Sequence, residues 1–217
     1  MKLFLTRHAE MTGDPFVCPE SPVKGCLSKR GMEQAEELRK VFANTKIDFA
    51  FSSPYGRTLQ TAETVLKNKN TPIIRCDFLK EWMPNKELEK LPSTKYEKIR
   101  KNTSNLFAEE TWKTELGEGT FDLYARICPP FLKELSKLGI HNRYGGFKVI
   151  RKAEDYNIAV FAHGGSLNIL MSFLLDLRPF PVGRFSFRLS GVAILEFQEQ
   201  KGIFYPNLVI PALSKPI

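Results

Sequence analysis

The sequence predicts an α/β protein: a three-layer α/β/α sandwich with a mostly parallel central sheet and a small helical cap insertion. Over the first 75 residues, short apolar segments alternate with amphipathic ones in the order strand, helix, strand, helix, strand. This alternation is typical of a sheet whose strands are joined by crossover helices. It stops over about 82–120, which we interpret as the cap. No repeat or long linker divides the chain, so we expect a single domain over residues 1–217.

Hydrophobic spacing and turn residues place the individual elements. Ser28 is a suitable N-cap for the first helix. Ser53 followed by Pro54 is a standard helix start, because the missing N–H of proline costs nothing at the first helical position. Pro129 and Pro130 should break or kink the helix that contains them. The expected strands are 2–6, 47–51, 72–75, 148–150, 158–162, 185–189 and 192–197, with a hairpin turn at 144–147, and the expected helices are 28–42, 54–66, 96–107, 121–138 and 167–175.

The charge balance favours an anionic partner. The 217 residues hold 32 Lys and Arg against 24 Asp and Glu, a formal net charge of +8. Charge alone cannot choose among phosphorylated metabolites, nucleic acid and a membrane surface. The chain shows no nucleic-acid-binding motif, no signal-peptide core and no apolar run of the roughly 20 residues that span a bilayer. We therefore expect a cytoplasmic protein with no nucleic-acid or membrane partner, and its four scattered cysteines should be reduced thiols.

Arginine and histidine residues follow three of the expected strands, either directly or after one short turn. If these strands are parallel neighbours, the side chains meet at the carboxyl edge of the sheet, where open α/β proteins bind ligands. Guanidinium groups suit phosphate oxygens, and a neutral imidazole can act as a nucleophile. The histidines lack carboxylates at metal-ligand spacing, so we expect no metal site. The residues are Arg7 and His8 after strand 2–6, Arg57 after strand 47–51, and His163 after strand 158–162.

Four collinear segments carry the most specific pattern in the chain. They are 6–10 (TRHAE), 27–35 (LSKRGMEQA), 52–63 (SSPYGRTLQTAE) and 161–165 (FAHGG). These segments resemble, in order, the Arg-His-Gly signature, the L-S-x-x-G-x-x-Q-A segment, the S-S-P-x-x-R-x-x-Q-T-A block and the second histidine motif of the histidine phosphatase superfamily, also called phosphoglycerate-mutase-like. The resemblance covers most of the chain and is weakest from about Trp82 to Leu116.

The resemblance implies a role for each matched residue. His8 would be the nucleophile and would be transiently phosphorylated, while Arg7, Arg57 and His163 would bind the phosphoryl oxygens and stabilise charge during transfer. The segment 78–82 resembles the family's L-x-E segment, which makes Glu81 the expected proton donor to the leaving alkoxide. The other carboxylates that stay open for this role are Glu10, Glu87 and Glu118.

The sequence departs from the family pattern in two places. Ala9 stands where glycine usually follows the nucleophile, and its methyl group would crowd the site slightly. Residues 82–85 (WMPN) stand where some mutase branches have G-x-W-E-G. This second departure puts mutase activity in doubt more than phosphatase activity.

We therefore expect a histidine acid-type phosphatase, a metal-independent phosphomonoester hydrolase that acts through a phosphohistidine on His8 and needs no cofactor. The alternatives are a phosphoglycerate-type phosphomutase and a catalytically weak protein that binds phosphorylated ligands. The substrate would be a small phosphorylated molecule or a phosphoprotein, and a homodimer stays open. Residues that set specificity should lie in 10–26 and 82–120, where the resemblance is poorest.

Overall fold

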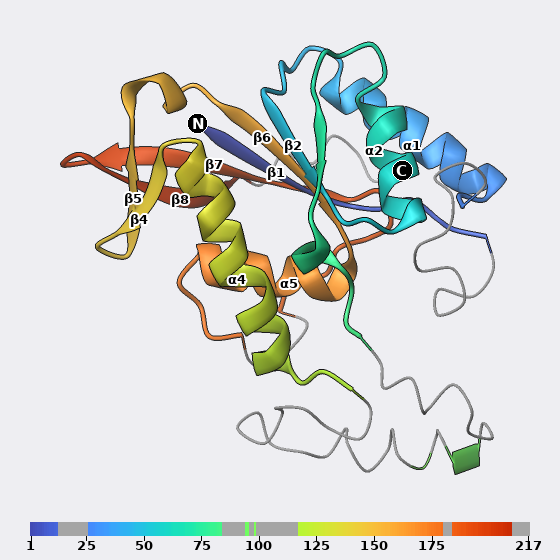
Figure 1. Cartoon of the computed structure of the whole chain (residues 1–217). Coiled ribbons are helices and arrows are strands. Elements are labelled where there is room, and N and C mark those ends of the chain that lie inside the picture. The colour runs from blue at the N-terminus through green and yellow to red at the C-terminus, as the bar shows by residue number, and fades with distance from the viewer. Residues whose placement is uncertain (13–25, 84–93, 96–97, 99–116, 180–183, 210–217) are drawn as a thin grey trace.

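An eight-stranded sheet forms the centre of the protein, and helices pack against it (Figure 1). The computed structural model describes residues 1–12, 26–83, 94–95, 98, 117–179 and 184–209. The strand order is β3-β2-β6-β1-β7-β8-β5-β4. The strands are β1 (Lys2–Arg7), β2 (Phe49–Ser52), β3 (Ile73–Arg75), β4 (Ile140–Arg143), β5 (Gly146–Val149), β6 (Asn157–Ala162), β7 (Val192–Gln200) and β8 (Ile203–Val209). The helices are α1 (Lys29–Phe42), α2 (Gly56–Val65), α4 (Thr120–Lys137) and α5 (Gly164–Leu174), with short 3-10 helices η1 (Asp77–Leu79) and η4 (Arg151–Ala153).

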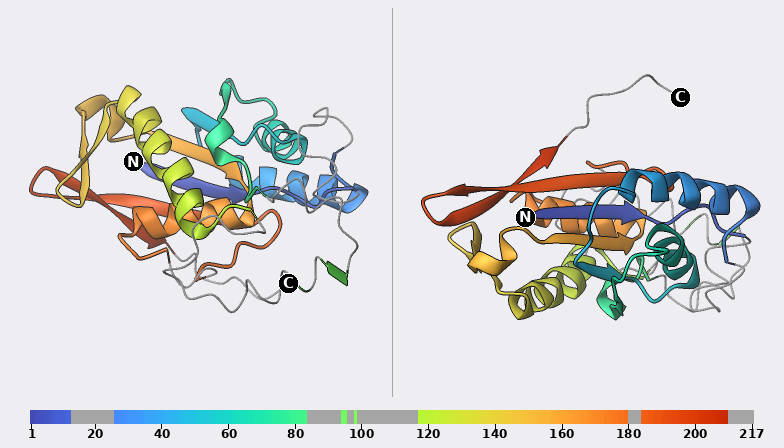
Figure 2. Two further views of the ribbon diagram at one scale, coloured as in Figure 1. Left: turned by 60° about the horizontal axis from the view of Figure 1, so that its bottom comes forward. Right: turned by 90° about the horizontal axis from the view of Figure 1, so that it is seen from above.

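The sheet is mixed, which corrects the expectation of a mostly parallel sheet. β3, β2, β6 and β1 are parallel neighbours, whereas β7, β8, β5 and β4 join the sheet antiparallel. Two-residue turns explain why strands in the second half of the sheet are antiparallel, because such short turns can join only antiparallel strands. Tyr144-Gly145 and Lys201-Gly202 are such turns, and all four residues have positive φ. Figure 2 shows the β7–β8 hairpin reaching past the amino end of β1.

Helices cover both faces of the parallel half, as expected for three layers (Figure 1). Successive side chains along a strand point to opposite faces, so each strand contributes to two apolar clusters. One cluster joins the sheet to α4 and α5, and the other joins it to α1 and α2. Leu3, Leu5, Ile158 and Val160 belong to the first cluster, while Phe4, Ala159 and Phe161 belong to the second.

The two helices on the second face begin differently. Ser28 caps α1 as predicted, since its hydroxyl accepts the N–H of Gly31 at 2.9 Å. The prediction that α2 starts at Pro54 is wrong, because the helix begins at Gly56 and its cap residue Tyr55 has extended backbone angles. The chain stays extended through Ser53, whose N–H continues the sheet hydrogen bonds. The serine side chain is thereby left for another partner.

Helix α4 continues through Pro129 and Pro130, so the expected break does not occur. A proline inside a helix removes a hydrogen bond and crowds the preceding turn, at a cost of about 3 kcal/mol. The buried face of α4 offsets this cost, because Ile127, Phe131 and Leu135 are almost fully enclosed in the core.

The last part of the sheet also differs from the prediction. Residues 185–189 form a loop rather than a strand, and the strand that forms a hairpin with β7 is β8, which the sequence did not predict. The expected helix 96–107 lies almost entirely, and the cap at 82–120 lies mostly, outside the described residues. Cys76 and Cys128 are free thiols, as expected, and Cys18 lies outside the described residues. Within the described ranges, no helix combines the length and apolar character that crossing a membrane requires.

Candidate active site

The carboxyl ends of β1, β6 and β2 meet at one edge of the sheet. In the register of the strands, the last residue of β1 lies beside the last residue of β6, and β2 ends one residue short of that level. Hydrogen bonds carry the register one residue further, from the His8 N–H to the Ala162 carbonyl (3.1 Å) and from the Ser53 N–H to the Phe161 carbonyl (2.9 Å). His163 directly follows β6. The three residues that leave these strands therefore lie next to one another.

The two histidines are neighbours within this edge. Their ring centroids are 5.1 Å apart, and His8 and His163 are only 7% and 0% exposed. Nδ1 of His8 lies 2.7 Å from the carbonyl oxygen of Ala9. A carbonyl oxygen can only accept a hydrogen bond, so Nδ1 carries the proton in the neutral ring. The lone pair is then on Nε2, the atom available for nucleophilic attack.

His163 is oriented by two hydroxyl groups. Its Nε2 lies 2.8 Å from Oγ of Ser53 and 3.3 Å from Oγ1 of Thr58. Ser53 Oγ accepts the N–H of Tyr55 at 3.4 Å, so its own hydrogen is available for the imidazole. This arrangement favours the tautomer with the proton on Nδ1. Nδ1 is buried and has no hydrogen-bond partner among the described residues.

Two guanidinium groups lie beside the histidines. Nη1 of Arg7 donates to the carbonyl of Phe187 at 2.7 Å, which uses the loop at 185–189 to hold this side chain. Nε of Arg7 is buried and has no hydrogen-bond partner in the described part of the chain. Arg57 is 3% exposed, and its guanidinium lies 4.8 Å from the centroid of the Tyr55 ring. A buried cationic donor without an acceptor, such as Nε of Arg7, indicates an anionic ligand.

Burial keeps both imidazoles neutral. Desolvation is the main cause that lowers the pKa of His8 from 6.5 to about 3, and the nearby cations Arg57 and Arg7 add to it against an opposing hydrogen bond to Ala9. Desolvation likewise holds the pKa of His163 well below 6.5, again with help from the arginines. A neutral ring at physiological pH is the form in which His8 can attack an electrophile.

Glu81 reaches the same edge from the segment after η1. Its Oε2 accepts the N–H of Gly165 (3.1 Å), and its Oε1 accepts the N–H groups of Ser166 (3.1 Å) and Trp82 (3.0 Å). A methyl group on Gly165 would lie 2.6 Å from Oε1, so glycine is needed for this approach. Because α5 starts directly after His163, the carboxylate lies close to the histidines.

The other carboxylates considered as proton donors hold backbone or side-chain groups elsewhere. Glu118 forms an ion pair with Arg126, with 2.6 Å between Oε1 and Nε. Glu10 accepts the hydroxyl hydrogen of Ser28 at 2.7 Å. Glu87 lies outside the described residues.

The remaining motif residues hold the backbone that follows β1. Oγ1 of Thr61 accepts the N–H of Ala9 at 3.0 Å and donates to the carbonyl of Arg57 at 2.7 Å. Oε1 of Gln34 accepts the N–H of Glu10 at 2.9 Å. Through Thr61, the backbone of Ala9 is therefore joined to the backbone of Arg57. This connection fixes the position of His8, the neighbour of Ala9, relative to Arg57.

Ala9 fits this frame without strain. It is fully buried in a small apolar cluster with Leu27 and Ala35. The non-glycine residues with positive φ lie elsewhere in the described chain, so the backbone at position 9 suits alanine as well as glycine. The expected crowding of the site is not seen, because the methyl group points into apolar packing.

Sequence reasoning missed several residues that support the site. Ser53 was expected to cap a helix, yet its hydroxyl contacts His163. Thr58 and Tyr55 also lie against that ring, and Arg126 contacts the backbone beside Glu81. Within the described ranges, His, Cys, Asp and Glu side chains form no group of three or more that could hold a metal ion.

An α/β protein with two buried histidines and two arginines at one sheet edge matches a known class. The model of the histidine phosphatase superfamily (branch 1) matches residues 3–205, and the chain belongs to this family. Phosphoserine phosphatase 1 of Hydrogenobacter thermophilus is 31% identical over 147 residues, which span 63% of this chain and 65% of that enzyme, a little under two thirds of its length. A 2,3-bisphosphoglycerate-dependent phosphoglycerate mutase of Methanosarcina mazei is 25% identical, over 99% of this chain and 98% of that protein.

Solved structures support the fold. A mycobacterial glucosyl-3-phosphoglycerate phosphatase in complex with inorganic phosphate superposes with a TM-score of 0.71 at 18% identity, over 96% of this chain and 95% of that chain. The α-ribazole phosphatase of Shigella flexneri has a TM-score of 0.70 at 19% identity, over 96% of each chain. The curated relatives include both a phosphatase and a phosphoglycerate mutase.

Proposed function

We propose that the protein hydrolyses phosphomonoesters through a phosphohistidine on Nε2 of His8. The observation that carries the proposal is the meeting of two buried, neutral imidazoles with the guanidinium groups of Arg7 and Arg57 at one sheet edge. The guanidinium groups and Nδ1–H of His163 would donate to the phosphoryl oxygens. A phosphate dianion would supply the charge, and it would supply acceptors for Nε of Arg7 and Nδ1 of His163, which have no hydrogen-bond partner among the described residues.

The reaction would follow two displacements at phosphorus. The Nε2 lone pair of His8 forms the P–N bond as the P–O ester bond breaks, and the carboxyl group of Glu81 gives its proton to the leaving alkoxide. A water molecule then attacks phosphorus, the Glu81 carboxylate takes its proton, and the P–N bond breaks to release phosphate. The protein residues complete this cycle without a metal or an organic cofactor.

The nature of the substrate rests on the groups around the phosphate. The residues described above recognise only the phosphoryl group, so they suit a small phosphorylated molecule or a phosphoprotein equally. The relative from Hydrogenobacter thermophilus is a phosphoserine phosphatase, which makes phosphoserine a first substrate to assay.

Phosphoglycerate mutase activity is the second candidate, because the mutase of Methanosarcina mazei matches nearly the whole chain. A mutase returns the phosphoryl group from His8 to a bound sugar acid, whereas a phosphatase passes it to water. Incubation with a phosphoglycerate separates the two: isomerisation of the substrate supports the mutase, and release of inorganic phosphate supports the phosphatase.

The experiment that tests the proposal measures phosphate release from an aryl phosphate and from phosphoserine, with a chelator present. His8→Ala should lower kcat by at least about a thousandfold, because no other group in this scheme can form the covalent intermediate. His141→Ala is the matched control, since His141 is an exposed residue of β4. Activity that persists in His8→Ala would remove this residue from the mechanism. A protein-bound phosphate label that survives alkali and is lost in acid should be present in the parent and in His141→Ala.

A further inference from the structure

The position of Glu81 depends on contacts from outside its own segment. Residues 80–83 follow η1 and form neither helix nor strand. Their backbone therefore has no regular hydrogen-bond ladder to define it. The carboxylate of Glu81 is held by the first turn of α5, but its main chain is held by a residue of α4 (Figure 1).

That residue is Arg126, and all its N–H groups are engaged. Nη1 donates to the carbonyls of Phe78 (2.9 Å) and Lys80 (3.1 Å), and Nη2 donates to the carbonyl of Glu81 (3.1 Å). Nη2 and Nε also donate to the two oxygens of Glu118, at 2.8 and 2.6 Å. A guanidinium has five N–H donors in a rigid plane, and here they meet three carbonyls and one carboxylate.

Glu118 completes the clamp from the other side. Its Oε2 accepts the N–H of Met83 at 2.9 Å, and its own N–H donates to the Met83 carbonyl at 3.1 Å. Its carbonyl accepts the indole N–H of Trp82. Arg126 and Glu118 together therefore hold the backbone on both sides of Glu81.

The ion pair between Arg126 and Glu118 is largely enclosed, and an enclosed ion pair contributes little net free energy to folding. The side chains of Arg126 and Glu118 are 18% and 13% exposed. Removing two charges from water costs about as much as their attraction returns, so the ion pair itself adds little to the stability of the fold. What the guanidinium supplies instead is geometry, because its plane places three carbonyls in fixed positions around one loop.

We propose that Arg126 is a positioning residue that, with Glu118 as its counter-ion, fixes the backbone of residues 78–83 so that the Glu81 carboxyl reaches the leaving oxygen. The inference rests on the proposed function, because it assumes that Glu81 is the proton donor. In the first displacement, which kcat/KM reports, a displaced donor lowers the rate only where the leaving group needs a proton. In the second displacement the same carboxylate acts as base for every substrate, so kcat does not separate the two leaving groups. Misplacement by about 1 Å is enough to cost on the order of a hundredfold in such a step.

The test compares two substrates that differ in their leaving group. Glycerol phosphate releases an alkoxide that needs a proton, whereas 2,4-dinitrophenyl phosphate releases a phenolate that does not. In Arg126→Met, kcat/KM should fall about 30-fold or more for glycerol phosphate and less than about threefold for the dinitrophenyl ester. Arg126→Lys keeps the charge without the planar fork and should show the same selectivity to a smaller degree. Glu81→Gln defines the full effect of losing the donor.

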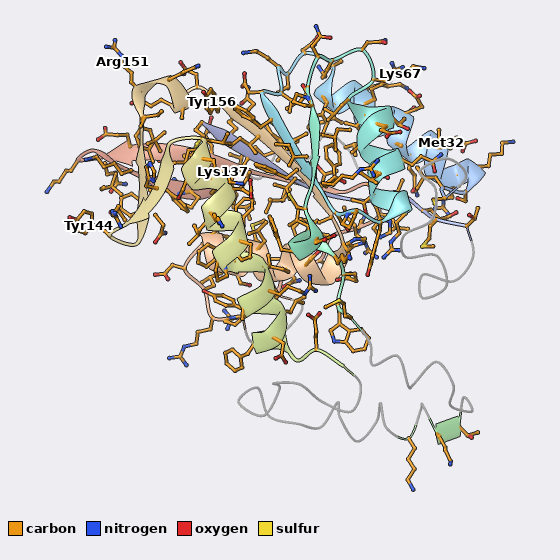
Figure 3. The ribbon with its side chains drawn as sticks, in the orientation of Figure 1. Met32, Lys67, Lys137, Tyr144, Arg151 and Tyr156 are labelled. Atoms are coloured by element: carbon orange, nitrogen blue, oxygen red, sulfur yellow. The ribbon has the colours of Figure 1, made fainter. Side chains whose placement is uncertain are left out.

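Lys137→Met is the matched control. Lys137 lies near the carboxyl end of the same helix and pairs with Glu134 on the surface (Figure 3). It should leave both rates unchanged. Because Arg126→Met strands the Glu118 carboxylate, the double variant Arg126→Met/Glu118→Gln removes that unpaired charge and should show the same selectivity.

The outcomes separate the inference from the proposal beneath it. Equal losses of kcat/KM for both substrates in folded Arg126 variants, or no loss, would overturn the positioning role while Glu81→Gln stays selective. Equal losses of kcat/KM for both substrates in Glu81→Gln would overturn the assignment of the donor and the inference with it. If neither the single nor the double Arg126→Met variant folds, the clamp serves stability and the positioning role is overturned.

Discussion

Gly31 offers a sharp test of how the His8 segment is held. The glycine lies in the first turn of α1, directly under the backbone of Glu10. In an ordinary helix, replacing glycine with alanine should stabilise the protein by up to about 1 kcal/mol. Here a methyl group would lie 1.9 Å from the carbonyl oxygen of Glu10, so we expect Gly31→Ala to act in the opposite direction.

The size of the effect follows from the contacts of Glu10. Its carbonyl must retreat by about 1.5 Å to reach an ordinary van der Waals distance. That carbonyl accepts the N–H of Ser28 at 3.0 Å, and the N–H of Glu10 donates to Gln34 at 2.9 Å. Overpacking and two weakened hydrogen bonds together should cost about 2–4 kcal/mol. For a protein of this length the Tm should fall by roughly 5–15 °C. His8 is two residues away, so kcat should also fall, on the order of a hundredfold.

Thermal unfolding and phosphate release from an aryl ester measure the two effects. Gly145→Ala is the control, since Gly145 has open space around its Cα and only its positive φ opposes alanine, at about 1 kcal/mol. Its neighbour Tyr144 lies at the far side of the molecule from Met32 of α1 (Figure 3), so activity should be unchanged. A Gly31→Ala protein that is more stable than the parent and fully active would refute the reasoning.

Two further predictions concern the histidines. Because His8 stays neutral in the fold down to about pH 3, while an ordinary histidine takes a proton below 6.5, the unfolded chain binds a proton that the folded chain does not. Stability should therefore be complete above pH 6.5 and fall as the pH drops from 6.5 toward 3, by about 1.4 kcal/mol per pH unit for each such histidine. Urea unfolding at pH 7, 6, 5 and 4 measures this slope, and His8→Gln should reduce it by one proton; an unchanged slope would contradict the burial effect. Ser53→Ala should lower kcat about tenfold, because the His163 ring loses the hydroxyl that orients it. The control is Ser172→Ala, which removes a buried hydroxyl bonded within α5 and should leave kcat unchanged. Equal activity of the two variants would count against the role of Ser53.

Local pattern predicts the parallel half of the fold well and the antiparallel half poorly. Residues 185–189 (FSFRL) alternate like a strand, yet they form the loop whose carbonyl at Phe187 binds Arg7. β8 contains Pro206, which normally argues against a strand inside a sheet. Although β8 lies between β7 and β5, β5 pairs with it only at Phe204. At Pro206, β8 therefore pairs with β7 alone, which is why the proline is tolerated. Such outcomes depend on neighbours that are distant in sequence, so alternation alone cannot reveal them.

The same limit separates the residues of the candidate site from the residues that hold them in place. The sequence could place Arg7, His8 and His163 at one sheet edge because each lies at the carboxyl end of a predicted strand, and these ends meet at one edge of a parallel sheet. No local sequence pattern identifies the side chains that hold the site residues in place. Ser53 lies 110 positions from His163, and Arg126 lies 45 positions from Glu81. Glycine is the intermediate case. A glycine at positions 31 and 165 indicates that another group approaches the backbone closely. Only the fold shows that this group is the Glu10 carbonyl at Gly31 and the Glu81 carboxylate at Gly165. The glycines of these motifs therefore act by leaving space for the oxygen atoms of Glu10 and Glu81, which a larger side chain at either position would displace.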